Sequence, residues 1–237
     1  MTRLPIPVDA EKAQARGAQA AWAYPVAGGL AALLAGLGGL GFGALGLPDT
    51  IVAGLALAVL ILITGALHED GLADTADGLW GGWTLDRRLE IMKDSHIGSY
   101  GVLALTLSVL LRWACLVALV PTGAFLPALV VAGMLSRAGM IAVMGALRNA
   151  RKGGLSATTG RPQTGIIAIG GGLAVLATLL CFGFAATFAL MITLVFVTSS
   201  AAAIANRKIG GQTGDTLGAT QQINEIALLA CLAALLS

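Results

Sequence analysis

The chain has 237 residues, of which 57% are apolar and only 11% are charged. This composition excludes a soluble domain, and the net charge of +2 says little because the charged residues form a few clusters between long apolar runs. We therefore expect an all-α, polytopic integral membrane helix bundle that forms one domain over residues 1–237. Its expected surroundings are a lipid bilayer, with no nucleic-acid partner.

Seven apolar runs follow a polar leader, and we interpret each of them as a membrane pass. The runs cover residues 26–47, 50–67, 99–120, 123–147, 165–185, 186–205 and 223–236. The last run is short, so it is either a final span or a re-entrant segment. Small residues such as Gly39 and Gly43 in the first run indicate closely packed helices, which would also permit a homo-oligomer.

The basic residues are distributed unevenly along the chain. Twelve of the 14 Lys and Arg residues lie in the leader or in the polar segments 80–98, 148–164 and 206–222. With seven passes these segments share one face, which the positive-inside rule places in the cytoplasm. The charge distribution therefore predicts the N-terminus inside, the C-terminus outside and three polar loops on the cytoplasmic side, where we expect the active site.

The densest cluster of charge begins with His68 and Glu69, directly after the second apolar run. If the chain continues there as a helix, Asp70, Asp74 and Asp77 follow at i, i+4 and i+7 and share a stripe about 60° wide. Three carboxylates that close together repel one another unless a cation lies among them, and hard oxygen ligands suit Mg²⁺. The alternative is an ordinary solvated helix end, which is uncommon at membrane depth.

The two later polar segments carry groups that suit a diphosphate. The segment 148–164 is rich in Arg and Lys, which bind phosphate oxygens, and the Gly-rich segment 208–219 offers backbone N–H groups to an anion. The candidates are Arg148, Arg151, Gly211, Thr213 and Gly214 for substrate, with Asp215 as a further metal ligand. A Gly-rich turn alone is a weak signal, and a plain loop between spans is the alternative.

Two arginines, Arg112 and Arg137, lie inside predicted spans. A charge in a span usually faces the bundle interior or a wet cavity. Glu225 in the last span is an available partner for either arginine, which favours a structural group over direct substrate contact.

Three motifs occur in an order that is typical of a known family. They are H-x-D-G-L-A-D-T-x-D-G at 68–78, R-L-E-I-M-K-D-S-x-I-G at 88–98 and G-G-x-T-G-D-x-L-G-A at 210–219, preceded by matching leader segments at 2–7 and 24–28. With these motifs the chain resembles the cobalamin synthase family, the adenosylcobinamide-GDP ribazoletransferases. His96 departs from the pattern, because Arg is more usual there.

The resemblance implies a reaction and a set of site residues. The family joins adenosylcobinamide-GDP to α-ribazole or its 5′-phosphate, releases GMP and uses Mg²⁺. The implied metal ligands are Asp70, Asp74, Asp77 and Asp215; the implied catalytic candidates are His68, Glu69, Lys93 and Asp94; the implied substrate contacts are Arg87, Arg88, His96, Arg148, Arg151, Gly211, Thr213 and Gly214. Lys93 would stabilise the charge on departing GMP, and a carboxylate is favoured as the base.

Two other functions remain open at this point. A CDP-alcohol phosphotransferase also uses spaced Asp residues and Mg²⁺, but its pattern has Ala-Arg where this chain has Leu72 and Ala73 after the first Asp-Gly pair. A cation-coupled transporter would use the intramembrane Arg and Glu residues as a relay. The absence of an internal repeat and the gathering of carboxylates at one face argue against a transporter.

Overall fold

The structure, a computed structural model, describes residues 2–3 and 9–236. Within these residues every regular element is helical, apart from an isolated β-bridge between Asn149 and Gln212. The long helices are α2 (Ala23–Ala44), α3 (Asp49–Thr64), α6 (Ser99–Leu119), α7 (Phe125–Ala146), α9 (Thr164–Ile209) and α10 (Gly214–Leu236). The shorter elements are α1 (Ala10–Arg16), η1 (Gly17–Ala20), α4 (Leu67–Gly81), α5 (Leu85–Ile91) and α8 (Leu155–Thr159). The all-α prediction is confirmed.

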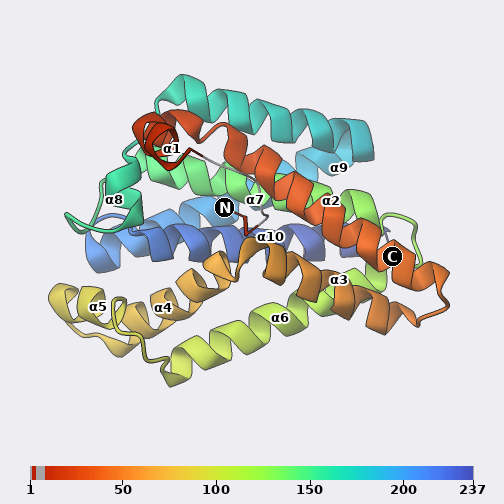
Figure 1. Ribbon diagram of the computed structural model, residues 1–237, viewed down its shortest axis with the longest axis horizontal. Helices are drawn as coiled ribbons and strands as arrows, with labels where there is room; N and C mark the ends of the chain where they lie inside the picture. The colour runs from red at the N-terminus through yellow and green to blue at the C-terminus, as the bar shows by residue number, and fades with distance from the viewer. Residues whose placement is uncertain (1, 4–8, 237) are drawn as a thin grey trace.

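Helices α7 and α10 form the centre of the bundle (Figure 1). Helix α7 lies against α2, α9 and α10, and 78% of its most apolar stretch is buried. Helix α10 also contacts α4 and α6, so it connects the two sides of the molecule. Because both helices are surrounded by protein, polar side chains on them can find partners inside the bundle.

Helix α9 is a hairpin of two legs rather than one continuous rod. Gly183 has a φ of 72°, a left-handed conformation that glycine adopts without steric cost, and it separates residues 164–182 from 184–209. Gly170 of the first leg faces Ile141, and Leu194 of the second leg faces Gly139, so both legs pass the same part of α7. The predicted boundary after residue 185 lies two residues from this turn.

The acidic helix α4 is separated from α3 by a sharp break. Gly65 and Ala66 both have positive φ values, 66° and 55°, and the two helices meet at 87°. The side chain of Glu69, in the first turn of α4, pairs with Arg112, which also pairs with Glu225; these two partners lie well inside α6 and α10. The motif begins inside the bundle and runs outward from there.

The structure also changes the predicted passes. Five helices are long and apolar enough to cross a membrane, or six if α3 and α4 form one broken pass, which supports a multi-pass membrane protein. The count of seven stays a prediction, which the two legs of α9 would satisfy if each crosses the bilayer. The loop predicted at 206–222 is wrong, because α9 continues to Ile209 and α10 begins at Gly214. The final run belongs to a 23-residue helix that is long enough to span.

The polar segments gather at one end of the bundle. Helices α5 and α8 and the first turn of α10 lie at the same end, whereas the C-terminus lies at the opposite end (Figure 1). The β-bridge between Asn149 and Gln212 joins the α7–α8 loop to the α9–α10 turn at this end. Groups that are far apart in the sequence thus come together beside α4.

Candidate functional site

The site is built on a close crossing of α4 and α10. A Cβ atom placed on Gly71 would lie 2.8 Å from the backbone oxygen of Asp215, and one on Gly218 would lie 3.4 Å from the Cα atom of Gly71. The approach therefore requires glycine at Gly71, whereas a Cβ at Gly218 would only tighten the contact. The crossing brings the carboxylates of α4 next to the first turn of α10.

The first turn of α10 is held by a reciprocal cap. The Thr213 amide donates to the Thr216 hydroxyl at 2.8 Å, and the Thr216 amide donates to the Thr213 hydroxyl at 3.3 Å. The Thr213 hydroxyl also donates to Asp215, whose Oδ2 accepts a charged bond of 2.9 Å from Arg151. The cap and the ion pair fix Asp215 at the positive end of the helix, where a carboxylate is favoured.

The three aspartates of α4 have different surroundings. Asp70 is exposed and Asp74 is half-buried, and neither side chain has a hydrogen-bond partner among the described residues. Asp77 is buried, and its two oxygens accept from the amides of Gly98 at 2.7 Å and Gly101 at 2.9 Å. Asp77 therefore caps the N-terminus of α6, which would otherwise leave those N–H groups unsatisfied.

The carboxylates at the crossing fit Mg²⁺ as a pair of ligands that leaves its other positions to water and substrate. Among residues 2–3 and 9–236, no three His, Cys, Asp or Glu groups lie close enough to enclose a metal ion. Mg²⁺ usually binds through one or two carboxylates and completes its octahedron with water and substrate phosphate oxygens. The unpartnered carboxylates of Asp70 and Asp74 supply such a pair of hard ligands, and Asp215 lies across the helix crossing.

A cavity of about 190 Å³ opens beside this crossing. Its polar lining is Asp70, His68, Arg151, Ser156, Thr159 and Asp215. Its apolar lining is Leu67, Met140, Met144 and Leu217, together with the ring of Tyr24. The Nη1 atom of Arg151 is buried without a partner among the described residues, so it remains available to a phosphate oxygen.

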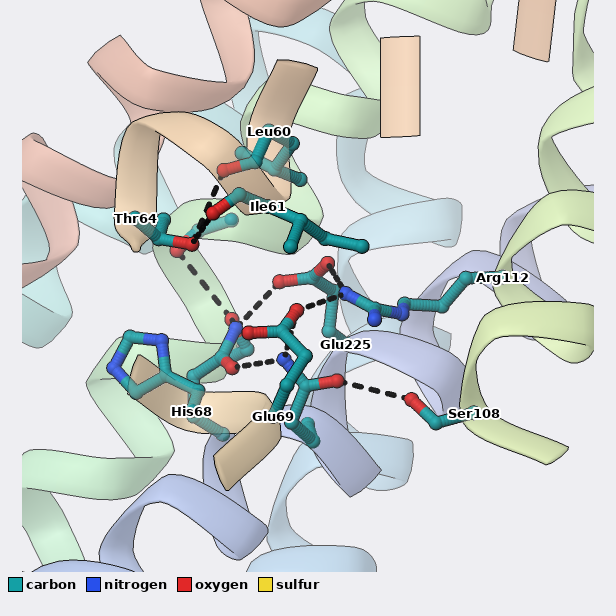
Figure 2. Close-up of polar contacts among 12 residues, drawn as sticks. Leu60, Ile61, Thr64, His68, Glu69, Ser108, Arg112 and Glu225 are labelled. Carbon is teal, nitrogen blue, oxygen red and sulfur yellow. Dashed lines mark hydrogen bonds and ion pairs between the residues drawn. The ribbon is translucent and has the colours of Figure 1, made fainter. Parts of the chain in front are cut away.

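Glu69 points away from the cavity into a buried polar network (Figure 2). Arg112 Nη1 donates to Glu69 at 3.0 Å and to Glu225 at 3.4 Å, which confirms Glu225 as a partner of an intramembrane arginine. The amide of Gln222 donates to Glu69 at 3.1 Å, and Ser108 donates to Gln222 at 3.0 Å. Glu69 thus links α4 to α6 and α10. Its side chain does not line the cavity.

The predicted basic residues divide into those that support the backbone and those that face solvent. Arg88 donates to the carbonyl oxygens of Gly82 and Lys208, both at 2.9 Å, and Arg148 donates to the carbonyl of Gly210 at 2.8 Å. These bonds join the loops of the polar end to one another.

The remaining candidates on and after α5 lie on the surface. Arg87 pairs with Glu90 at 2.7 Å, Lys93 is exposed, and Asp94 accepts from the His96 ring at 2.7 Å. The Asp94 hydrogen bond raises the pKa of His96, and the same bond lowers the pKa of Asp94. None of these side chains lines the cavity.

Comparison with known proteins decides the family. The family model for cobalamin-5-phosphate synthase matches residues 1–233. The chain belongs to that family. It is 47% identical over 231 residues to an adenosylcobinamide-GDP ribazoletransferase of Bradyrhizobium diazoefficiens, covering 97% of this chain and 89% of the relative. It is 42% identical over 240 residues to one of Brucella ovis, covering 97% and 91% respectively. No solved structure matches the chain.

Several residues around this cavity of the cobalamin-5-phosphate synthase are not among the candidates that the sequence predicts. Gly71 and Gly218 belong to the motifs of the sequence, but only the structure shows that they lie where α4 and α10 cross. Tyr24 and Met140 have no chemical signature in the sequence, because an apolar side chain in a span normally faces lipid or core. Arg137 was noted as an intramembrane charge, and the structure places its Nη2 atom 3.5 Å from His68 Nδ1.

Proposed function

We propose that this protein joins adenosylcobinamide-GDP to α-ribazole, or to its 5′-phosphate, and releases GMP, with Mg²⁺ at the α4–α10 crossing. The observation that carries the proposal is the meeting of Asp70 and Asp215 with Arg151 at the edge of a cavity, with Asp74 one helical turn from Asp70, in a chain of the cobalamin-5-phosphate synthase family. The relatives in Bradyrhizobium and Brucella carry the name of this activity.

The reaction is a phosphoryl transfer between two oxygens. A ribose hydroxyl of α-ribazole forms a bond to the phosphorus on the aminopropanol arm, its proton leaves, and the bond from that phosphorus to the GMP oxygen breaks. Positioning and charge neutralisation dominate the catalysis of such transfers. Mg²⁺ held by Asp70 and Asp74 would supply the charge that neutralises the diphosphate.

Arg151 has the geometry of a phosphate ligand that is oriented in advance. Its Nη2 atom is fixed by Asp215 at 2.9 Å, and its Nη1 atom has no partner among the described residues. A guanidinium held by one edge presents its other N–H groups in a fixed direction. We therefore propose that Arg151 binds an oxygen of the diphosphate. The surface residues Arg87, Lys93 and His96 would contact parts of the large corrinoid substrate that lie outside the cavity.

The distribution of basic residues indicates which side of the membrane the site faces. The basic loops gather at the end that carries α5 and α8, and the positive-inside rule assigns such an end to the cytoplasm. We propose an inner-membrane protein of a bacterium whose active site faces the cytoplasm. A homo-oligomer through glycine-lined helices also remains a prediction.

The test is a transferase assay on detergent-purified protein that follows GMP and cobalamin together. With adenosylcobinamide-GDP, α-ribazole and Mg²⁺ we expect both products in equal amounts, lost on chelation and in Asp74→Ala. Asp86→Ala, which removes an exposed carboxylate from the neighbouring helix α5, is the matched control and should retain activity. A folded protein that forms neither product would instead favour a CDP-alcohol phosphotransferase or a transporter.

A further inference from the structure

The cavity beside the crossing has two chemically different parts. Asp70, Arg151 and Asp215 form a charged edge that suits phosphate and metal. The rest is formed largely by Tyr24, Met140 and other apolar side chains, and the methionine is only 3% exposed. Flexible thioethers and an aromatic ring bind flat apolar groups well, whereas a phosphate gains nothing from them.

His68 contributes a second buried polar atom without a protein partner to the lining of this cavity, besides Arg151 Nη1. His68 is 3% exposed and lines the cavity, and its Nε2 atom has no hydrogen-bond partner among the described residues. A buried polar atom in this position is costly unless a ligand satisfies it.

The proton on His68 is located by its neighbour. Arg137 Nη2 lies 3.5 Å from His68 Nδ1, and a guanidinium can only donate. Nδ1 of a neutral ring must then be the acceptor, which leaves the hydrogen on Nε2. Arg137 is itself held by a bond of 3.0 Å to the carbonyl of Gly133, so the arrangement is fixed from the α7 side. The Nε2–H group of His68 is therefore unpaired in the wall of the cavity, and a ligand that reaches it must carry an acceptor.

We propose that this cavity is the subsite for the heterocyclic base of the acceptor nucleoside, with His68 Nε2–H donating to the base's free ring nitrogen. The inference rests on the proposed function and deepens it. A benzimidazole is flat and apolar and carries one unprotonated ring nitrogen, which matches the apolar lining and the N–H donor of His68. A base seated there places its attached ribose toward Asp70 and Arg151, where the hydroxyl must meet the diphosphate.

The assignment predicts a preference among lower-ligand bases. A benzimidazole riboside satisfies His68, whereas an indole riboside of nearly the same shape has a C–H group in place of the acceptor nitrogen. A site that hydrogen-bonds a ligand atom rejects the analogue that lacks it, because the buried donor stays unpaired. Purine ribosides also fit less well, since their additional polar atoms would meet Met140 and Met144.

The experiment measures binding of the two ribosides to the purified full-length protein by titration calorimetry, without Mg²⁺ or the corrinoid. We expect the wild-type protein to bind the benzimidazole riboside about tenfold more tightly than the indole riboside. The ratio should fall to about one in His68→Leu. Thr178→Val is the control, because the Thr178 hydroxyl only bonds to the carbonyl of Ala174 in its own helix.

The wild-type comparison alone can overturn the inference, even if His68→Leu fails to fold. Equal binding of the two ribosides, no binding of either, or equally strong displacement of the benzimidazole riboside by ribose 5-phosphate would each contradict it. The transferase assay separates this result from failure of the proposed function. Equal binding with normal turnover removes only the base subsite, whereas no turnover with any acceptor removes the proposed reaction itself.

Discussion

At the scale of single residues, carboxylates on one helix stripe have different tasks because each meets a different neighbour. Asp70 and Asp74 have no partner among the described side chains, whereas both oxygens of Asp77 accept backbone amides at the start of α6. A Cβ atom on Gly98 would lie 2.5 Å from the Asp77 carboxylate, so glycine is needed for this approach. The same residue type therefore serves a proposed metal site and a helix cap within two turns.

This difference predicts that one alanine substitution lowers stability and the other lowers turnover. Asp77→Ala should lower the free energy of unfolding by about 1–3 kcal/mol, because two amides of α6 lose their acceptor. Asp74→Ala should leave stability within about 0.5 kcal/mol but reduce turnover on the order of 100-fold or more. Thermal unfolding without Mg²⁺, together with the transferase assay, measures both. Equal thermal stability of the two variants would show that Asp77 is not a structural cap.

The surface pair of Asp94 and His96 predicts a pH dependence. The Asp94 hydrogen bond raises the pKa of His96 above its ordinary value of 6.5 and lowers the pKa of Asp94 below 3.8. The stabilisation by protonated His96 is thus complete below pH 6.5 and is lost as pH rises through the raised pKa, while the Asp94 contribution is complete above pH 3.8.

Titration of the His96 ring by NMR measures this shift directly. In the wild-type protein its pKa should lie above 6.5, and Asp94→Asn should return it toward that value. Both side chains are exposed, so this substitution should not change the fold. An unshifted His96 in the wild-type protein would contradict the ion pair.

At the scale of helices, the α4–α10 crossing decides which carboxylates meet. The two backbones approach at Gly71 and Gly218, and the cap at Thr213 fixes where α10 begins. A small shift of either helix would separate Asp70 from Asp215 without changing a single residue of the site. The geometry of the proposed metal site therefore depends on two residues that have no side chain.

The crossing can be tested by adding one methyl group. Gly71→Ala should place its Cβ against the Asp215 backbone, cost about 1–3 kcal/mol of stability and raise the Mg²⁺ concentration required for turnover. The control is Gly172→Ala on α9, where an added Cβ meets nothing within 4 Å. Alanine is the better helix former, so the control should be neutral or stabilising. The measurements are thermal unfolding and the Mg²⁺ dependence of turnover, made on both variants. Equal stability and equal Mg²⁺ dependence in Gly71→Ala and Gly172→Ala would refute the close crossing.

At the scale of the whole molecule, a buried ionic network joins the broken pass to the bundle. Arg112 on α6 bonds to Glu69 on α4 and to Glu225 on α10 (Figure 2), and Arg137 on α7, beside His68, is a second buried cation. Two negative and two positive groups balance within the bundle, where an unpaired charge would be costly. The network holds the inner end of α4, and therefore the position of the cavity.

Removing one member should unbalance the network. Arg112→Leu should cost about 3–5 kcal/mol, because Glu69 and Glu225 then lie buried with too little compensating charge. The double variant Arg112→Leu with Glu69→Gln restores the balance of charge, since one buried carboxylate, Glu225, and one buried cation, Arg137, then remain, and it should recover part of that loss. Thermal unfolding in detergent measures both variants. Wild-type stability in Arg112→Leu would mean that the network does not hold the pass.

The sequence alone determined the class of the protein, most of its apolar segments and the candidate metal motif. Hydrophobic runs and residue spacing are local properties, so they predicted membrane helices and placed Asp70 and Asp74 on one helix face. The resemblance of three ordered motifs predicted the family, which the comparisons confirmed. The burial of Gln222 could not be predicted in this way, because a polar residue is expected in a loop until its partners are known.

Only the tertiary structure decided which polar groups meet. Glu69 and Asp70 are adjacent in the chain, yet one lies in a buried ion pair and the other lines the cavity. The free N–H of His68 follows from Arg137, which is 69 positions away. The physical reason is that the cost of a buried charge or amide depends on the atoms beside it, and those atoms come from helices that the order of the sequence does not place next to one another.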